Sequence, residues 1–172
     1  NFDLIYGLPH QDVASCVETA RQAVRIAPDR FAVFGYAHVP GFKLHQRKIQ
    51  EQALPGAADR HAQSEAIAET LIAAGYVRIG LDHFALPDDT LAQAAAGGTL
   101  RRNFQGYATD NADALLGMGA SAIGRLPQGF VQNSPDLGGY ARAIESRQFA
   151  TAKGIALSAD DRVRGNIIER LM

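Results

Sequence analysis

A strand–helix–strand pattern in the first forty residues most constrains the fold. Alternating side chains predict a strand over residues 1–6, and apolar residues at spacings of three and four predict a helix over residues 11–26. The apolar run of residues 30–35 predicts a second strand. A helix crossover makes two strands of one sheet parallel, so an α/β fold is expected. Its chemistry should gather at the carboxyl ends of the strands, residues 6–9 and 36–40.

The remaining elements follow from the same periodicities. Helices are expected at residues 57–74, 87–96 and 135–147, and a last helix begins at Ser158 with a capping box. Gly75 is suited to end the helix before it. Strands are expected at residues 76–81 and 130–133, a polar link at residues 43–52 and a loop at residues 101–107. Asp82, His83 and Phe84 should then lie at the end of the third strand.

The composition excludes several classes of function. The net charge of −1 indicates no nucleic-acid partner, and no apolar run reaches the roughly 20 residues of a membrane span. The single cysteine excludes an internal disulfide, and a cytoplasmic location is therefore expected. No histidine has a metal-ligand spacing, so no metal site is expected in this segment. Cys16 falls on the apolar stripe of its helix and should be an inert core thiol.

Asp3 interrupts a strand that should be apolar if the sheet is covered on both faces. A carboxylate buried in a sheet is costly unless it is paired or binds a ligand. Two interpretations remain open: Asp3 caps a loop or pairs with an arginine, or it contacts a ligand.

Other polar residues have two interpretations each. His38 and His83, each placed after an expected strand, are either acid–base residues or hydrogen-bonding partners of the sheet end. Arg101 and Arg102 either hold carboxylates or form an exposed surface pair. Residues 117–122, GMGASA, match GxGxxA, but their late position and the glycines and proline that follow make a nicotinamide site a weak interpretation.

Six segments in one order carry a family resemblance. They are FDLIYGLP (2–9), VFGYAHVP (33–40), QRKI (46–49), GLDHFALPDD (80–89), RRNFQGY (101–107) and LLGMGASAI (115–123). Together they resemble the oxygen-independent coproporphyrinogen III oxidase (coproporphyrinogen dehydrogenase) family of the radical S-adenosylmethionine superfamily. The resemblance covers essentially the whole chain.

The resemblance implies a fold and a domain organisation. Residues 1–110 would form the last β/α units of a three-quarter, TIM-like (β/α)6 barrel. Residues 111–172 would close the barrel and start an α-rich C-terminal extension. The family motif CxxxCxxC and the early glycine-rich segment are absent, so we expect a C-terminal portion of a longer protein that is inactive alone.

The resemblance also implies the reaction. Family members use a 4Fe–4S cluster and two S-adenosylmethionine molecules to decarboxylate two propionates of coproporphyrinogen III oxidatively to vinyl groups, which gives protoporphyrinogen IX in haem biosynthesis. The expected partners are the porphyrinogen and an electron-donor protein, and the parent enzyme is expected to be a monomer. The cluster would be bound by the missing N-terminal part.

The resemblance also implies site residues, which are assigned by their positions in the matching motifs. Asp3 resembles a ligand of the second S-adenosylmethionine, and Ala37 and Ile123 resemble contacts to the first. Phe104 and Gln105 resemble residues that line the cofactor and substrate cavity. The resemblance gives His38 and His83 supporting roles, while Arg101 and Arg102 as propionate-binding residues are a hypothesis from the residues alone. The alternatives are a related haem chaperone and a non-catalytic nucleotide-binding module that uses GMGAS.

Overall fold

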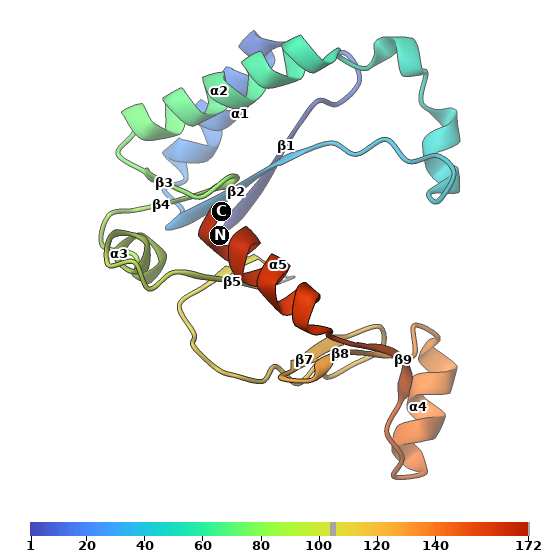
Figure 1. Cartoon of the computed structure of the whole chain (residues 1–172). Coiled ribbons are helices and arrows are strands. Elements are labelled where there is room, and N and C mark those ends of the chain that lie inside the picture. The colour runs from blue at the N-terminus through green and yellow to red at the C-terminus, as the bar shows by residue number, and fades with distance from the viewer. Residues whose placement is uncertain (104–105, 172) are drawn as a thin grey trace. The chain divides into compact units, whose positions relative to one another are not determined.

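The computed structural model describes residues 1–103 and 106–171 and divides the chain into two compact units. Unit 1 comprises Asn1–Thr109 and unit 2 comprises Asp110–Met172 (Figure 1). Each unit has its own sheet and is described by itself.

The strand–helix–strand prediction for the start of unit 1 is confirmed. Strand β1 (Phe2–Tyr6), helix α1 (Val13–Arg25) and strand β2 (Arg30–Gly35) follow one another, and the two strands pair in parallel. A capping box starts α1, in which the Asp12 carboxylate accepts the Ser15 N–H at 2.7 Å. The Ser15 hydroxyl in turn accepts the Asp12 N–H at 3.0 Å, so local chemistry sets where the helix begins.

The third strand differs from the prediction. After helix α2 (Ala57–Ala73), strand β3 (Val77–Ile79) turns back at once into strand β4 (His83–Ala85). The sheet order is β1-β2-β4-β3, and β4 is antiparallel to both neighbours. Gly80 has φ +57°, a left-handed conformation that allows this tight turn. His83 is therefore the first residue of β4, paired with Ala32 and Ile79, and does not lie in a loop after the third strand.

One face of this sheet packs against α1 and α2, which lie together on it (Figure 1). Both helices turn their small and branched residues toward aromatic side chains from the strands. The buried core on this face comprises Cys16, Ala20, Ala23, Phe31, Val33, Ile67, Ala68, Leu71, Tyr76 and Phe84. Tyr76 donates its hydroxyl to the Pro28 carbonyl at 2.7 Å, so the polar end of this buried ring is satisfied.

The opposite face is covered only in part. Helix α3 (Thr90–Ala96) packs Leu91 and Ala92 against Ile79 of β3 and Ala85 of β4. Asp89 caps α3 through the Leu91 N–H at 2.7 Å and pairs with the Arg30 guanidinium at 2.7 Å, which ties α3 to β2. The part of this face formed by β1 and the end of β2 stays exposed.

Two segments of unit 1 are more regular than predicted. The polar link contains the 3-10 helices η1 (Leu44–Lys48) and η2 (Glu51–Ala53). The predicted loop at residues 101–107 contains the antiparallel strands β5 (Arg101–Asn103) and β6 (Gly106–Ala108). The short strand pair was not predicted, because its sequence is a mixture of cations and amides without an apolar run. Its stability comes from cross-strand contacts.

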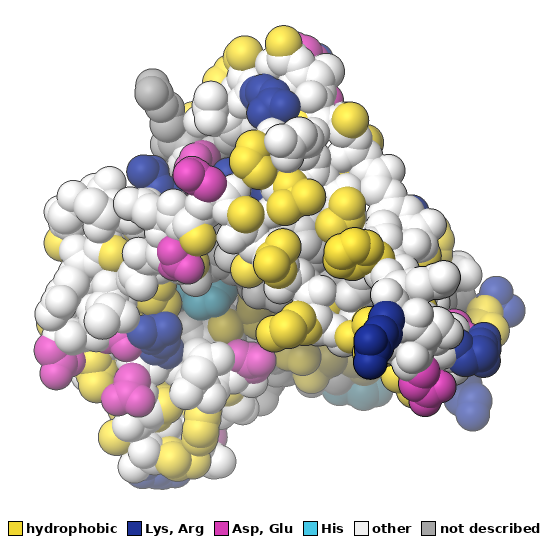
Figure 2. Space-filling model, turned by 90° about the horizontal axis from the view of Figure 1, so that it is seen from below, with side chains coloured by type: hydrophobic (Ala, Val, Ile, Leu, Met, Phe, Trp, Pro, Cys, Tyr) yellow, Lys and Arg dark blue, Asp and Glu magenta, His cyan; other side chains and the backbone are white. Residues whose placement is uncertain are grey.

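Unit 2 is a three-stranded antiparallel sheet of β7 (Ile123–Leu126), β8 (Gly129–Asn133) and β9 (Thr151–Ala156), with helices α4 (Leu137–Glu145) and α5 (Ala159–Leu171). The predicted strand at 130–133 and both helices are confirmed. The three-stranded sheet was not part of the expected α-rich region, because β9 is exposed along its whole length and its sequence is weakly patterned. Apolar side chains reach the surface of the described chain, as Figure 2 shows, and Phe149 and Met118 are at least 90% exposed.

Candidate functional site on the open sheet face

The uncovered part of the unit 1 sheet is the strongest candidate site. Its register places Asp3 beside Ala32 and Ala32 beside His83, so these three side chains share one face. Ile5 and Phe34 form the neighbouring row on the same face. We call this set the open sheet face: Asp3, Ile5, Ala32, Phe34 and His83. It combines one exposed carboxylate, one mostly buried imidazole and the exposed apolar side chains of Ile5 and Phe34, whereas Ala32 is only 2% exposed.

Asp3 is exposed, so the expectation of a buried carboxylate is wrong. The helices cover the other face of β1, where Phe2, Leu4 and Tyr6 pack against the core. The Asn1 amide donates to the Asp3 carboxylate at 2.9 Å. Because a carboxylate on an uncovered face keeps its water, Asp3 does not incur the desolvation cost that a buried site would impose.

His83 is the most constrained polar residue of the open sheet face. Its Nδ1 lies 2.7 Å from the Asp82 carboxylate, and its side chain is only 17% exposed. The imidazole meets the Phe34 ring edge-on at 6.1 Å and the Tyr107 ring at 5.1 Å between centroids. These contacts fix both the orientation and the plane of the ring.

Tyr107 connects the β5–β6 strand pair to the β3–β4 turn. Its hydroxyl accepts the Leu81 N–H at 3.0 Å and the Arg102 guanidinium at 3.0 Å. The Arg102 guanidinium also lies 4.8 Å from the centre of the Tyr107 ring. A Cβ at Gly80 would lie 1.9 Å from the hydroxyl, so only glycine fits there. Arg102 is half-buried by these contacts, whereas Arg101 is exposed, so the two are not an equivalent pair.

The predicted cavity residues Phe104 and Gln105 lie outside the described residues. They fall between β5 and β6, the two strands that Tyr107 connects to the sheet.

The segment after β2 is held by a glutamine that sequence reasoning missed. Gln46 is 7% exposed, donates to the Ala37 carbonyl at 3.0 Å and accepts the Val39 N–H at 2.6 Å. Ala37 itself is exposed, and the two hydrogen bonds of Gln46 keep the backbone around it in one conformation. His38 contacts the Tyr36 hydroxyl at 3.3 Å and Glu51 at 3.4 Å, which agrees with a supporting role.

A second glutamine, also missed, fixes the segment after β1. Gln63 is 1% exposed, accepts the Gly7 N–H at 3.0 Å and donates to the Gln11 carbonyl at 2.7 Å. Its place among alanines on α2 was the only signal in the sequence. A fully buried amide within an apolar helix face usually satisfies buried backbone groups.

Ile123 belongs to unit 2, where it begins β7 and is half-buried. The preceding segment, residues 117–122, leads into an antiparallel strand and opens no helix, so the interpretation as a dinucleotide fingerprint is wrong. Asn133 donates to the carbonyls of Gly117 and Gly119, both at 3.0 Å. The Tyr140 hydroxyl accepts the Gly119 N–H at 3.0 Å, so this glycine-rich turn is a fixed structural element.

No metal cluster can be assembled from the described residues. Nowhere in the described ranges do three or more His, Cys, Asp or Glu side chains gather. The single cysteine, Cys16, is buried in the core under α1, and its burial, helped by the nearby Asp12 charge, raises the pKa of the thiol. It is an inert core thiol as predicted, since a thiolate is the form that ligates and reacts.

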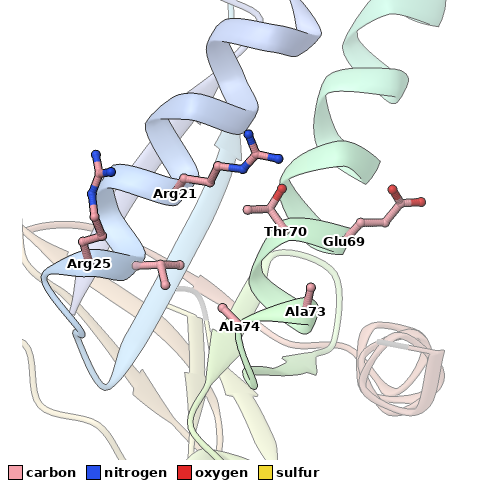
Figure 3. A pocket seen from close by; sticks show the side chains of 7 residues that line it. Arg21, Arg25, Glu69, Thr70, Ala73 and Ala74 are labelled. Carbon is pink, nitrogen blue, oxygen red and sulfur yellow. The ribbon is translucent and has the colours of Figure 1, made fainter.

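A groove lies between α1 and α2. It has a volume of about 560 Å³ and is lined by Arg21, Val24, Arg25, Glu69, Thr70, Ala73 and Ala74 (Figure 3). Arg25 already contacts Glu18 at 3.8 Å, and Thr70 donates to the Ala66 carbonyl. The groove brings no convergent set of catalytic groups together, so the open sheet face remains the better candidate.

No helix in the described ranges is long and apolar enough to cross a membrane.

The comparisons with known proteins confirm the family resemblance. The chain is 63% identical over all of its 172 residues to an oxygen-independent coproporphyrinogen III oxidase of Bradyrhizobium diazoefficiens, and 47% identical over the same length to one of Paracoccus denitrificans. It spans 38% of the length of each relative. No family model matches the chain.

A solved structure agrees with these relatives. The coproporphyrinogen III oxidase of Escherichia coli, described as a radical SAM enzyme, is 42% identical with a TM-score of 0.90. The match covers 98% of this chain and 39% of that one. The mixed α/β fold is therefore that of a segment of this enzyme.

Proposed function

We propose that this chain is part of an oxygen-independent coproporphyrinogen III oxidase and supplies that enzyme with one wall of its cofactor and substrate cavity. The observation that carries the proposal is the match along the whole chain, at 63% identity to one relative and with a TM-score of 0.90 to a solved structure. The reaction is the oxidative decarboxylation of two propionates of coproporphyrinogen III to vinyl groups.

The open sheet face fits the nucleoside part of S-adenosylmethionine. Asp3 is an exposed acceptor for ribose hydroxyls, and Ile5 and Phe34 beside it offer 40% or more exposed apolar surface for the base. Ala37 would contact a cofactor through the backbone that Gln46 holds. Contacts of Ile123, Phe104 and Gln105 with the cofactor or its cavity are proposed from the family resemblance alone. When bound, the cofactor supplies the hydrogen abstraction that starts the decarboxylation.

A 4Fe–4S cluster does not fit the residues of this chain, because one buried cysteine cannot provide its several thiolates. We therefore assign cluster binding to another part of the longer enzyme, and no step here passes through it. What the chain contributes is binding and orientation: a carboxylate, an apolar wall and a rigid backbone at the strand ends.

Further parts of the proposal rest on the family. Unit 1 would supply the last β/α units of a three-quarter (β/α)6 barrel, and two S-adenosylmethionine molecules would bind in the complete enzyme. One further hypothesis comes from the residues and not from the family: Arg102, which Tyr107 orients, and Arg101 would hold propionates of the substrate. An electron-donor protein, a monomeric state and a cytoplasmic location complete the proposal.

The test uses the full-length enzyme with its cluster, reduced and free of oxygen. S-adenosylmethionine and coproporphyrinogen III are supplied, and product mass is followed for the wild type, Asp3→Ala and Gln105→Ala. We expect loss of two CO₂ per substrate in the wild type and at least about a hundredfold lower rate in both variants, the size expected when binding groups at a reaction site are removed. Asp59→Ala, an exposed acid on α2, is the control and should keep full activity.

Two results would contradict the proposal. Cleavage of the cofactor without decarboxylation, together with a stable complex in a haem titration, would favour the related haem chaperone. Full activity in Asp3→Ala would show that the open sheet face is not the cofactor site.

A further inference from the structure

The Asp82–His83 pair is a hydrogen-bonded polar pair to which the proposed function assigns no role. Both side chains are mostly buried, at 24% and 17% exposure, yet His83 belongs to the open sheet face. Burying a carboxylate and an imidazole removes their hydrogen bonds to water, which costs free energy that a pair of apolar side chains would not lose. The hydrogen bond between the two side chains offsets part of this loss.

The hydrogen bond between the two residues defines the tautomer of His83. A carboxylate can only accept, so the Nδ1 atom 2.7 Å from the Asp82 oxygen carries the proton. In the neutral imidazole, Nε2 is then left as an acceptor. Asp82 thus presents His83 in one tautomer and one orientation.

Gly106 lies beside the other edge of the imidazole. A Cβ at Gly106 would lie 3.7 Å from both Cε1 and Nε2 of His83, and its φ of +136° disfavours any other residue. The Phe34 and Tyr107 rings meet the imidazole edge-on at 6.1 Å and 5.1 Å between centroids. The acceptor atom is therefore framed by aromatic rings, a setting suited to a flat heterocycle.

The distance between His83 and Asp3 indicates how long a ligand must be to contact both residues. One strand, which carries Ala32, separates the two residues, so their backbones are about 10 Å apart at the usual strand spacing. Ala32 itself is only 2% exposed, so the surface between them is formed by the side chains around it. A ligand held by Asp3 at one end would reach His83 at the other.

We propose that His83, oriented by Asp82, accepts a hydrogen bond from a ring N–H or amino group of a flat heterocycle lying on the open sheet face. This inference rests on the proposed function, which offers two sources of that chemistry: the amino group of the adenine in the cofactor, and the pyrrole N–H groups of the porphyrinogen. His83 is a positioning residue for whichever of the two it contacts.

The experiment compares four variants of the full-length, cluster-loaded enzyme. His83→Leu removes the hydrogen-bond acceptor, and His83→Gln restores an acceptor at a similar distance from the backbone. Asp82→Ala removes the carboxylate that keeps the proton on Nδ1 of His83. His61→Leu, on the exposed side of α2, is the control. The dissociation constant of S-adenosylmethionine is measured by calorimetry without substrate. Binding of coproporphyrin III is measured by fluorescence without cofactor, and KM and kcat are measured where turnover occurs. Thermal unfolding shows that each variant is folded.

We expect His83→Leu to weaken binding of one of the two ligands about tenfold, as for one lost hydrogen bond at a ligand site. Asp82→Ala should weaken the same ligand about threefold, and His83→Gln and His61→Leu should stay near the wild type. A change in the cofactor constant alone identifies adenine as the partner, and a change in porphyrin binding and KM alone identifies the pyrrole.

The inference is overturned if folded His83→Leu binds both ligands as the wild type does, or if His83→Gln fails to restore binding. Failure of the proposed function is a separate result. An enzyme that binds both ligands without decarboxylation would refute the proposed reaction while the two binding measurements still decide the role of His83.

Discussion

The two faces of the unit 1 sheet are built from the same strands and are used differently. On one face Phe31, Val33 and Phe84 are at most 5% exposed beneath α1 and α2. On the other, Ile5 and Phe34 remain 47% and 40% exposed. Adjacent residues of one strand, such as Val33 and Phe34, thus meet opposite environments.

The difference shows that stability and binding are separated by side-chain alternation. A strand residue on the covered face contributes to folding, and its neighbour on the open face is available to a ligand. A change on the covered face should therefore alter stability, and a change on the open face should alter binding. Mutations ordered by expected effect on the free energy of unfolding test this separation.

The largest effect is expected for Leu71→Ala on the covered face. Leu71 is fully buried between α2 and the strands, so its truncation should lower the free energy of unfolding by about 2–5 kcal/mol. Ile5→Ala on the open face is the matched control and should cost less than about 1 kcal/mol. Urea unfolding followed by circular dichroism measures both, and equal losses would refute the separation of the faces.

Gln63→Leu should have the next largest effect. The substitution leaves the Gly7 N–H and the Gln11 carbonyl without their partner, which costs about 1–3 kcal/mol. Hydrogen exchange at the Gly7 amide should become faster. Gln22→Leu, which removes only an exposed contact with Glu18, should change stability by less than about 0.5 kcal/mol. Unchanged exchange at Gly7 would show that Gln63 does not hold this segment.

Asp89→Asn should weaken the attachment of α3 in a pH-dependent way. Burial acts to raise the pKa of Asp89, but the hydrogen bonds from Arg30 and from the Leu91 N–H and the Arg30 charge outweigh it, so the pKa is lowered. A lowered folded-state pKa means that the stabilisation is present above the unfolded value, near 4, and is lost as the pH falls through the folded value.

We therefore expect Asp89→Asn to cost about 1–2 kcal/mol at pH 7, and the difference from wild type to shrink below pH 4. Urea unfolding at pH 7, 5 and 3 measures the difference. Asp88→Asn, at the exposed neighbouring acid, is the control. A difference that does not change with pH would show that the Arg30–Asp89 pair does not tie α3 to the sheet.

Asp3→Ala should have the smallest effect on folding. Its carboxylate is exposed and accepts a hydrogen bond from the Asn1 amide, so stability should change by less than about 0.5 kcal/mol. The same variant should lose binding of S-adenosylmethionine in the full-length enzyme. A large loss of stability would mean that Asp3 has a structural role instead.

Elements with a clear periodicity were predictable from the sequence. The helix of residues 11–26 and the strand Arg30–Gly35 have regular apolar spacing, and both are present. The strand Thr151–Ala156 and the pair of strands around residues 104–105 were not predicted. Their residues are polar or exposed, so only pairing with a neighbouring strand identifies them.

The candidate site was likewise predictable only in part. The residue types Asp3, His83 and Arg102 could be singled out by their unusual places in the sequence, and the order of the six motifs indicated the family. The orientation of Arg102 through Tyr107 and the roles of Gln46 and Gln63 could not be read from it. Gln63 bonds to Gly7, which is distant along the chain, and the shorter-range bonds of Gln46 and Arg102 depend on local backbone conformation that residue spacing does not specify.

The sequence by itself determined the elements with clear apolar periodicity, the family resemblance and the kinds of polar group available for binding, since these depend on residue type and short-range spacing. Only the tertiary structure decided which face of the sheet is open, that Asp3 is exposed on it, and that β4 inserts between β2 and β3 to bring His83 into the same row. The physical reason is strand pairing: a strand's own sequence specifies two faces, but its neighbours and the helices packed on them decide which face is covered.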